Sequence, residues 1–309
     1  KNFPAPLFLL SMSSCVHGAA FALTFLVCLG YARRVHTFAR RGQSISCAAA
    51  PVPAAAFHPV GPGVRLPMSD PTPGAGASEA EKKAWLSKQS VERSYHDEIV
   101  VKIEALKQEY DVRKYGALSI NQERYPLYAV MTRGWSAERP SLLLTGGVHG
   151  CETSGIHGAI LFLQTLAEAY SKTFNILVVP CVSPWGYETV NRENAQVVDP
   201  NRSFHRDGQT EESRAFIKLL QSLGVKQWMC HIDLHEQNSR KGFHLVSDKT
   251  KPRRAWHNAI ITAVRKVTNL ARAEPNDLRL KFFEQHGVMT IDSLSSLGMC
   301  AGLTNATYA

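Results

Sequence analysis

Between Tyr125 and Leu270, short apolar runs that favour strands alternate with longer segments whose apolar residues have helical spacing. The predicted strands cover residues 125–132, 141–145, 174–180, 228–234 and 243–246, and the predicted helices cover residues 152–170, 210–223 and 252–270. This alternation is typical of an α/β fold, with a mixed, mostly parallel sheet that carries helices on both faces. In such a fold, functional sites form beyond the carboxyl ends of the strands.

The sequence before this region divides into three parts. Residues 1–43 form a leader with a long apolar run at 7–31 and arginines on its carboxyl side, which is typical of a membrane anchor or a targeting segment. A third interpretation is an extension that the mature protein lacks. Residues 44–79 are rich in Ala, Pro, Gly and Ser, which predicts a disordered linker. A helical pattern begins at Glu79 and continues to about Tyr110, so we expect the main folded domain to span residues 80–309.

The positive charge of the chain is concentrated in the leader. The formal net charge is +9, but no acidic residue occurs before Asp70, and the basic residues of that stretch are Lys1, Arg33, Arg34, Arg40, Arg41 and Arg65. The rest of the chain is nearly balanced and shows no basic cluster interleaved with aromatic residues, so we expect no nucleic-acid partner. Membrane contact is expected only if the leader is an anchor, and the location, whether secretory, membrane-anchored or organellar, stays open. The seven scattered cysteines favour buried free thiols over a disulfide framework.

Metal-ligand side chains follow two of the predicted strands. His149 and Glu152 lie three residues apart where the strand 141–145 passes into a helix, and His235 follows the strand 228–234. Two histidines and a glutamate suit a catalytic zinc ion (Zn²⁺), which takes three protein ligands and keeps a fourth position for water. His231 competes with His235, because the two side chains point to the same face of a strand.

Two arginines and an asparagine lie between these ligands in the sequence. Arg192 follows Asn191, and Asn201 and Arg202 follow Asp199-Pro200. Arginine suits bidentate binding of a carboxylate and can also polarise a carbonyl oxygen. Together with an open metal site, these residues favour a substrate that carries a free carboxylate.

In their order along the chain, these motifs resemble the zinc carboxypeptidases of the carboxypeptidase A type, over roughly residues 95–309. The resemblance implies that His149, Glu152 and His235 bind the metal and that Arg192 polarises the scissile carbonyl. It also implies that Asn201 and Arg202 hold the substrate carboxylate, and that Asp199 supports the ligand His149. The expected activity is a zinc-dependent metallocarboxypeptidase that removes C-terminal residues from peptides.

The segment Asp233-Leu234-His235 is also similar to the aspartoacylase and succinylglutamate desuccinylase branch, whose members cleave an acyl group from an amino acid. The substrate is therefore either a peptide or an acyl amino acid with a free carboxylate. A third alternative is a zinc-binding pseudoenzyme without turnover. The resemblance implies a general-base glutamate that no acidic residue here matches, so we expect it beyond Ala309, with the domain incomplete at its C-terminus. Glu193 and Glu236 are weaker substitutes for this base.

Overall fold

The computed structural model describes residues 7–12, 73, 77–205, 208–236, 242–248, 254–266, 268–270, 283–285, 288–291 and 293–304. Most of the predicted leader 1–43 and of the predicted linker 44–79 therefore lies outside the described residues. Within the described residues, every helix is too short or too polar to cross a membrane. The described part of the leader is strand β1 (Leu7–Met12), which the sequence analysis does not predict as a strand.

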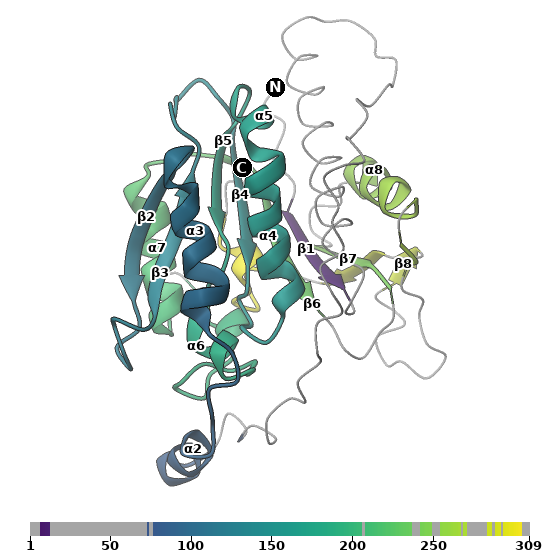
Figure 1. Ribbon diagram of the computed structural model, residues 1–309. Coiled ribbons are helices and arrows are strands. Elements are labelled where there is room, and N and C mark those ends of the chain that lie inside the picture. Colours follow the sequence, from purple (N-terminus) through teal and green to yellow (C-terminus); the bar gives the residue numbers. More distant parts are fainter. Residues whose placement is uncertain are drawn as a thin grey trace, which may run out of the picture.

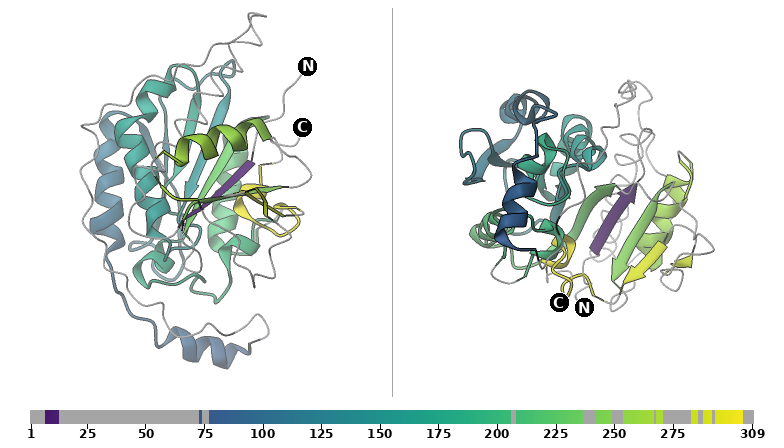
Figure 2. Two further views of the ribbon diagram at one scale, coloured as in Figure 1. Left: turned by 90° about the vertical axis from the view of Figure 1, so that its right-hand side faces the viewer. Right: turned by 90° about the horizontal axis from the view of Figure 1, so that it is seen from below.

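A nine-stranded mixed sheet organises the chain (Figure 1). Its strands lie in the order β2 (Asp111–Ala117), β3 (Pro126–Met131), β5 (Asn175–Val179), β4 (Ser141–Gly146), β6 (Trp228–Glu236), β1, β7 (His244–Asp248), β9 (Val288–Ile291) and β8 (Phe283–Gln285). Strands β5, β4, β6 and β1 run parallel to one another, whereas β2, β3 and β8 pair antiparallel. Strand β1 lies between β6 and β7, as the view from below shows (Figure 2).

Helices cover both faces of this sheet. The helical segments are α2 (Glu79–Leu86), η2 (His96–Val100), α3 (Val101–Ala105), η3 (Leu106–Gln108), α4 (Thr153–Thr165), α5 (Ala167–Ser171), α6 (Pro184–Glu188), η4 (Pro200–Arg202), α7 (Glu211–Ser222), α8 (Arg254–Val264) and η6 (Cys300–Gly302). Leu142 and Leu144 of β4 belong to the same core cluster as Ile156 of α4, whereas Leu143 joins the cluster of Phe216 of α7. Alternate residues of one strand thus serve opposite layers, and the predicted mixed α/β class is confirmed.

The predicted helix from Glu79 to about Tyr110 is wrong in its middle. Helix α2 ends at Leu86, and the next helical turn begins at His96. Glu188 explains the break: its carboxylate accepts the Tyr95 backbone N–H at 2.8 Å, and its carbonyl accepts the N–H groups of Glu92 and Arg93 at 2.7 and 3.2 Å. Backbone donors that bond to α6 cannot also bond within a helix. Tertiary partners thus override the local helical pattern.

Strand order and helix packing bring two strand ends together. The carboxyl ends of β4 and β6 are neighbours, with Gly146 paired to Leu234. Helix α4 starts a few residues after β4 and packs directly against β6. At Gly155, an added Cβ would lie 2.7 Å from the backbone oxygen of Leu234, so a glycine is needed for this approach. The loop after β4 and the last residues of β6 therefore share one small volume.

The Gly155→Ala substitution tests this contact. Alanine has the better helix propensity, by about 1 kcal/mol, but here its methyl group would push α4 away from Leu234. We expect a net loss of about 1–3 kcal/mol in the free energy of unfolding. Gln164→Ala, at an exposed position of the same helix, should change it by less than about 0.5 kcal/mol. Urea denaturation of both variants measures the difference, and equal stabilities would contradict the close approach.

Candidate metal centre

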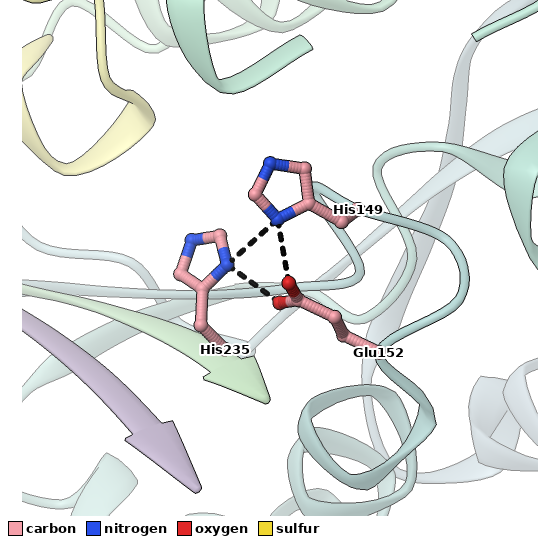
Figure 3. A group of neighbouring side chains, drawn as sticks. All are labelled: His149, Glu152 and His235. Carbon is pink, nitrogen blue, oxygen red and sulfur yellow. Dashed lines mark hydrogen bonds and ion pairs between the residues drawn. The ribbon is translucent and has the colours of Figure 1, made fainter. Parts of the chain in front are cut away.

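The structure brings the three predicted metal ligands together (Figure 3). His149 lies in the loop after β4, Glu152 is the residue before α4, and His235 lies near the end of β6. One ligand atom from each residue can be chosen so that all lie within 4.8 Å of one another, and all three residues are buried. Ligands that are 83 residues apart in sequence thus reach one point through the pairing of β4 with β6.

The atoms that face the centre of this group are both Nδ1 nitrogens and the Glu152 carboxylate. His149 Nδ1 lies 3.1 Å from His235 Nδ1, and the two Glu152 oxygens lie 2.8 and 2.7 Å from these nitrogens. Each Nε2 instead lies beside an aspartate: Asp199 Oδ1 at 3.0 Å from His149 and Asp233 Oδ2 at 2.9 Å from His235. With the Nε2 protons directed to carboxylates, both Nδ1 lone pairs point inward, and such a donor set fits zinc.

Asp233 is a site residue that the sequence analysis did not assign. It precedes His235 by two residues on β6, and this spacing places both side chains on the same face of the strand. Its second oxygen, Oδ1, accepts a 2.6 Å hydrogen bond from the Thr145 hydroxyl on β4. The motif Asp-x-His on a strand that ends at a site is the signal that could have identified it. Asp199, by contrast, has the position beside His149 that the resemblance implies.

The charges of the group favour a cation at its centre. Burial by itself would raise the pKa of the Glu152 carboxyl, but the imidazoles of His149 and His235 hold that pKa well below its usual range. Burial would likewise lower the pKa of His235, but Asp233 and Glu152 raise it to about 10. The carboxylates around the two imidazoles thus favour positive charge at this point, and a zinc ion that binds there would take the place of a proton on His235, because only the unprotonated nitrogen is a ligand.

The ligand loop is fixed by the segment around α6. An added Cβ on Gly150 would lie 2.0 Å from the Tyr187 backbone nitrogen, so no larger residue fits at this position. The Cys151 N–H donates to Asn191 O at 3.2 Å, and the Ser183 N–H donates to Gly147 O at 2.8 Å. These contacts hold the backbone on both sides of His149.

Glu236 is held at the start of α4. Its Oε2 atom lies 3.3 Å from the Ser154 backbone nitrogen and 3.0 Å from the Ser154 hydroxyl, both of which donate to it. Its own backbone N–H donates to Glu152 Oε2 at 2.9 Å. The main chain of Glu236 thus supports a metal ligand while its carboxylate bonds to the first turn of a helix. This arrangement disfavours Glu236 as the general base.

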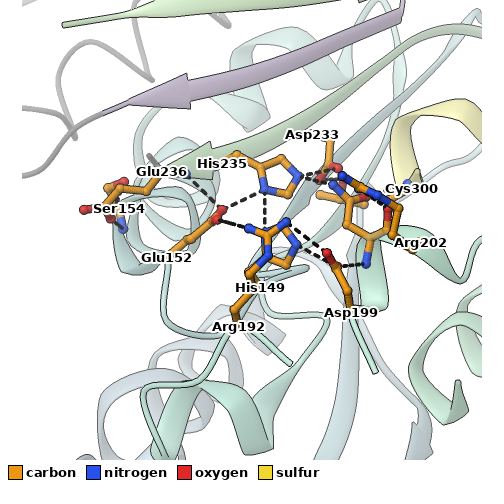
Figure 4. A network of polar contacts seen from close by, with 12 residues as sticks. His149, Glu152, Ser154, Arg192, Asp199, Arg202, Asp233, His235, Glu236 and Cys300 are labelled. Atoms are coloured by element: carbon orange, nitrogen blue, oxygen red, sulfur yellow. Dashed lines mark hydrogen bonds and ion pairs between the residues drawn. The ribbon is translucent and has the colours of Figure 1, made fainter. Parts of the chain in front are cut away.

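The guanidinium of Arg192 lies beside the ligand group (Figure 4). Its Nη1 atom is 3.3 Å from His149 Nδ1 and 3.6 Å from Glu152 Oε1, and its Nη2 atom donates to Asp199 Oδ2 at 3.0 Å. The side chain is 35% exposed, so one side of it remains open to a substrate. Asp199 therefore positions both His149 and Arg192.

Asn201 and Arg202 lie next to the same group but differ in exposure. Asn201 is buried, with its Nδ2 atom 3.2 Å from His235 Nε2 and its Oδ1 atom accepting the Cys300 N–H at 2.8 Å. Arg202 is exposed and donates one N–H to Asn201 O at 2.8 Å. A guanidinium has five N–H donors, so Arg202 retains the capacity to bind a carboxylate. The Asn201 amide is engaged within the protein.

His231, the predicted competitor of His235, and the other buried histidine, His157, have partners outside the ligand group. His231 is fully buried, and its Nε2 and Nδ1 atoms lie 3.0 and 3.2 Å from the hydroxyls of Thr145 and Thr304. Burial lowers its pKa to about 4, against the opposing charge of Asp233. His157 packs its ring edge-to-face against Tyr187, and burial together with Lys102 lowers its pKa to about 4. Among the described residues, His235 is the histidine of β6 that meets His149.

Residues 138–275 match the family described as the succinylglutamate desuccinylase/aspartoacylase catalytic domain. This stretch contains all three ligand residues as well as Arg192, Asp199 and Asn201. Over these residues the chain is similar to the zinc carboxypeptidase-like family, near its aspartoacylase branch. The recognition made from the sequence motifs is thereby confirmed.

Solved structures of low sequence identity share the fold. A candidate metallopeptidase from Shewanella denitrificans is 19% identical with a TM-score of 0.54, and the alignment covers 66% of this chain and 77% of the other. A second, from Shewanella amazonensis, is 22% identical with a TM-score of 0.52 and covers 66% of this chain and 78% of the other. No curated protein matches the sequence. The broader functional prediction, a metal-binding hydrolase of this superfamily, is supported by these findings together with the His-Glu-His group.

Metal content tests the ligand group directly. We expect about one zinc ion per chain, because three converging protein ligands make a complete catalytic site. His149→Ala and His235→Ala should each lose the metal, whereas the exposed His96→Ala should retain it. Elemental analysis after gel filtration of the folded proteins measures the ratio. Zinc retained in both ligand variants would refute this site.

The two buried neutral histidines predict a loss of stability in acid. The unfolded chain protonates histidine near pH 6.5, whereas His157 and His231 resist protonation down to about pH 4. These groups leave stability unchanged above pH 6.5, and the free energy of unfolding falls as the pH drops from there to about 4. At pH 5 the loss should be about 2 kcal/mol for each histidine.

Urea denaturation of the metal-free protein at pH 7 and pH 5 measures this loss. His157→Phe keeps an aromatic ring against Tyr187 but has no titrating group, so its stability should fall less between these two pH values. An equal fall in both proteins would show that His157 is protonated in the folded state or exposed to solvent.

Proposed function

We propose that the protein is a metal-dependent carboxypeptidase, a hydrolase that cleaves the amide bond next to a free C-terminal carboxylate. The observation that carries this proposal is the position of the Arg192 guanidinium, 3.3 and 3.6 Å from two atoms of the ligand group. Arg202 follows within the same loop and is exposed. A metal site and two cations then face one substrate that has a carbonyl and a carboxylate close together.

The ligand set indicates what the metal contributes. When bound, zinc supplies Lewis-acid activation of a water and of the scissile carbonyl. Arg192 donates to the carbonyl oxygen as negative charge develops on it, and Asp199 keeps the guanidinium in place without a change of rotamer. Because Arg192 is paired with Asp199 and partly buried, its guanidinium needs little reorientation when the transition state forms.

Arg202 is the group best suited to hold the substrate carboxylate. It is exposed and its planar guanidinium can form two parallel hydrogen bonds to a carboxylate. Asn201 supports this function through its backbone, because its carbonyl oxygen accepts a hydrogen bond from Arg202 at 2.8 Å. We propose that the Asn201 side chain, which faces His235, positions this ligand and contributes less to substrate contact than the resemblance implies.

A second candidate function is the removal of an acyl group from an N-acyl amino acid, which the family match over residues 138–275 favours. The two substrate classes present the same groups to this site, an amide bond followed by a carbon that bears a carboxylate. They differ in the acyl part, which is a long chain in a peptide and a small group in an acyl amino acid. Dependence of activity on the length of the acyl part therefore separates them.

The third candidate, a pseudoenzyme, depends on the general base. The described carboxylates around the site have other partners: Asp199 with His149 and Arg192, Asp233 with Thr145 and His235, and Glu236 with Ser154. The expectation of a glutamate beyond Ala309 stays a prediction. Assays of turnover by the purified protein test this candidate.

The arginine variants test the proposed functions. Arg192→Ala should lower kcat by about 100- to 1000-fold, because it removes one donor to the developing oxyanion. Arg202→Ala should mainly raise KM, because it removes a contact that substrate and transition state share. Arg113→Ala, on the edge strand β2, is the control and should leave both constants unchanged. Steady-state kinetics with a blocked dipeptide that has a free C-terminus measures these effects.

The same assay is repeated with substrates of different length and with substrates whose C-terminal carboxylate is amidated. A carboxypeptidase should hydrolyse longer peptides at least as well as a blocked dipeptide, whereas a deacylase should prefer N-acetyl and N-succinyl amino acids. Amidation of the C-terminus should abolish either activity. Equal hydrolysis of amidated substrates, or an Arg202→Ala variant with unchanged KM, would overturn carboxylate recognition. If the protein binds zinc but hydrolyses neither the peptides nor the N-acyl amino acids, the pseudoenzyme is the function that remains.

A further inference from the structure

A chain of buried hydrogen bonds leads from the metal ligand His235 to Thr304, well outside the ligand group. His235 Nε2 lies 2.9 Å from Asp233 Oδ2, and the Thr145 hydroxyl lies 2.6 Å from Asp233 Oδ1. The same hydroxyl lies 3.0 Å from His231 Nε2, and His231 Nδ1 lies 3.2 Å from the Thr304 hydroxyl. All five side chains are buried. Neither metal binding nor substrate binding accounts for the hydrogen bonds that continue beyond Asp233.

The donors in this chain can be assigned one after another. Thr145 has one hydroxyl proton, and the short contact to Asp233 uses it, so His231 Nε2–H must donate to Thr145. A neutral His231 then has an unprotonated Nδ1, which accepts the Thr304 proton. At the other end, the ionised Asp233 accepts from His235 Nε2–H. This sequence of donors selects the tautomer of His235 whose Nδ1 faces the metal ligands.

These groups are buried, so the loss of any one of the hydrogen bonds is costly. Asp233, His231 and Thr145 are each 0% exposed, so water cannot replace a partner that is removed. A buried polar group that loses its partner costs more than the bond itself contributed. Removing the Thr304 hydroxyl would leave His231 Nδ1 without a donor and weaken the preference for one tautomer. The effect would then pass through Thr145 to Asp233 and His235.

A second contact connects the same segment to His235. The Cys300 N–H donates to Asn201 Oδ1 at 2.8 Å, and Asn201 Nδ2 lies 3.2 Å from His235 Nε2. Cys300 begins the short helix η6, and Thr304 follows it within the same described segment, residues 293–304. Contacts from two residues of this segment therefore converge on one side of one metal ligand, one route through Asp233 and the other through the Asn201 side chain. Figure 4 shows Cys300 beside Asp233 and Arg202, opposite Glu152.

We propose that residues 300–304 form an outer support for the metal ligand His235, in which Thr304 and His231 act as positioning residues. Docking of this segment and metal binding then strengthen each other, because a coupling between two events is reciprocal. The inference deepens the proposed function and rests on a metal ion that binds to His149, Glu152 and His235. It assigns neither Thr304 nor His231 a contact with substrate.

Two substitutions at one position separate the hydroxyl group from the packing. Thr304→Val keeps the shape of the side chain and removes the hydroxyl, and Thr304→Ser keeps the hydroxyl and removes a methyl group. Zinc affinity of the folded proteins, measured by competition with a chromophoric chelator, should fall at least about fivefold in Thr304→Val. It should stay close to that of the unaltered protein in Thr304→Ser. Asp233→Asn should weaken binding by about 10- to 100-fold, because it alters the direct partner of a ligand.

Hydrogen exchange tests the reciprocal effect without any assay of activity. Addition of zinc to the metal-free protein should slow exchange of the Cys300 N–H, and this protection should be smaller in Thr304→Val. Equal zinc affinities in the valine and serine variants, or exchange at Cys300 that zinc leaves unchanged, would overturn the proposal. Absence of zinc binding by the unaltered protein would instead overturn the proposed function, so the two failures are distinguishable.

Discussion

Two imidazole nitrogens and a carboxylate converge at the end of the sheet, and their mutual position depends on most of the structure around them. Their facing atoms lie 2.7 to 3.1 Å apart in a buried region. Unshielded lone pairs and a buried carboxylate are unfavourable at such distances without a cation. Aspartates hold the far nitrogens, and a proton or metal ion between the near nitrogens would offset the charge of the buried carboxylate.

The sheet brings the ligands together, and the loops determine how they point. Parallel pairing of β4 with β6 places the loop that carries His149 beside the end of the strand that carries His235. Helix α4 can start beside them because Gly155 lets its backbone approach Leu234. The segment after β5 then crosses over the ligand loop and supplies Arg192 and Asp199, so that cation, metal ligands and supporting carboxylate meet in one place.

Much of the fold could be predicted from the sequence where periodicity was strong. The predicted strands 141–145 and 174–180 and the helix 210–223 correspond to β4, β5 and α7, because each buries an apolar face with a regular repeat. Prediction failed between Ser87 and Tyr95, where Glu188 captures backbone donors from a distant part of the chain. Strand β2 was missed because this edge strand exposes polar residues and lacks an apolar run.

For the site, the sequence by itself determined which residue types were available and where they stood relative to the strands. His149, Glu152, His235, Arg192 and Arg202 all follow from local motifs and their order. Only the tertiary structure decided that Nδ1 of each histidine faces inward, that Asp233 shares this task with Asp199, and that the Asn201 amide faces His235. The reason is physical: a tautomer is selected by the partner of the other ring nitrogen. For His149 that partner is 50 residues away, and the support of Asp233 reaches 88 residues back to Thr145.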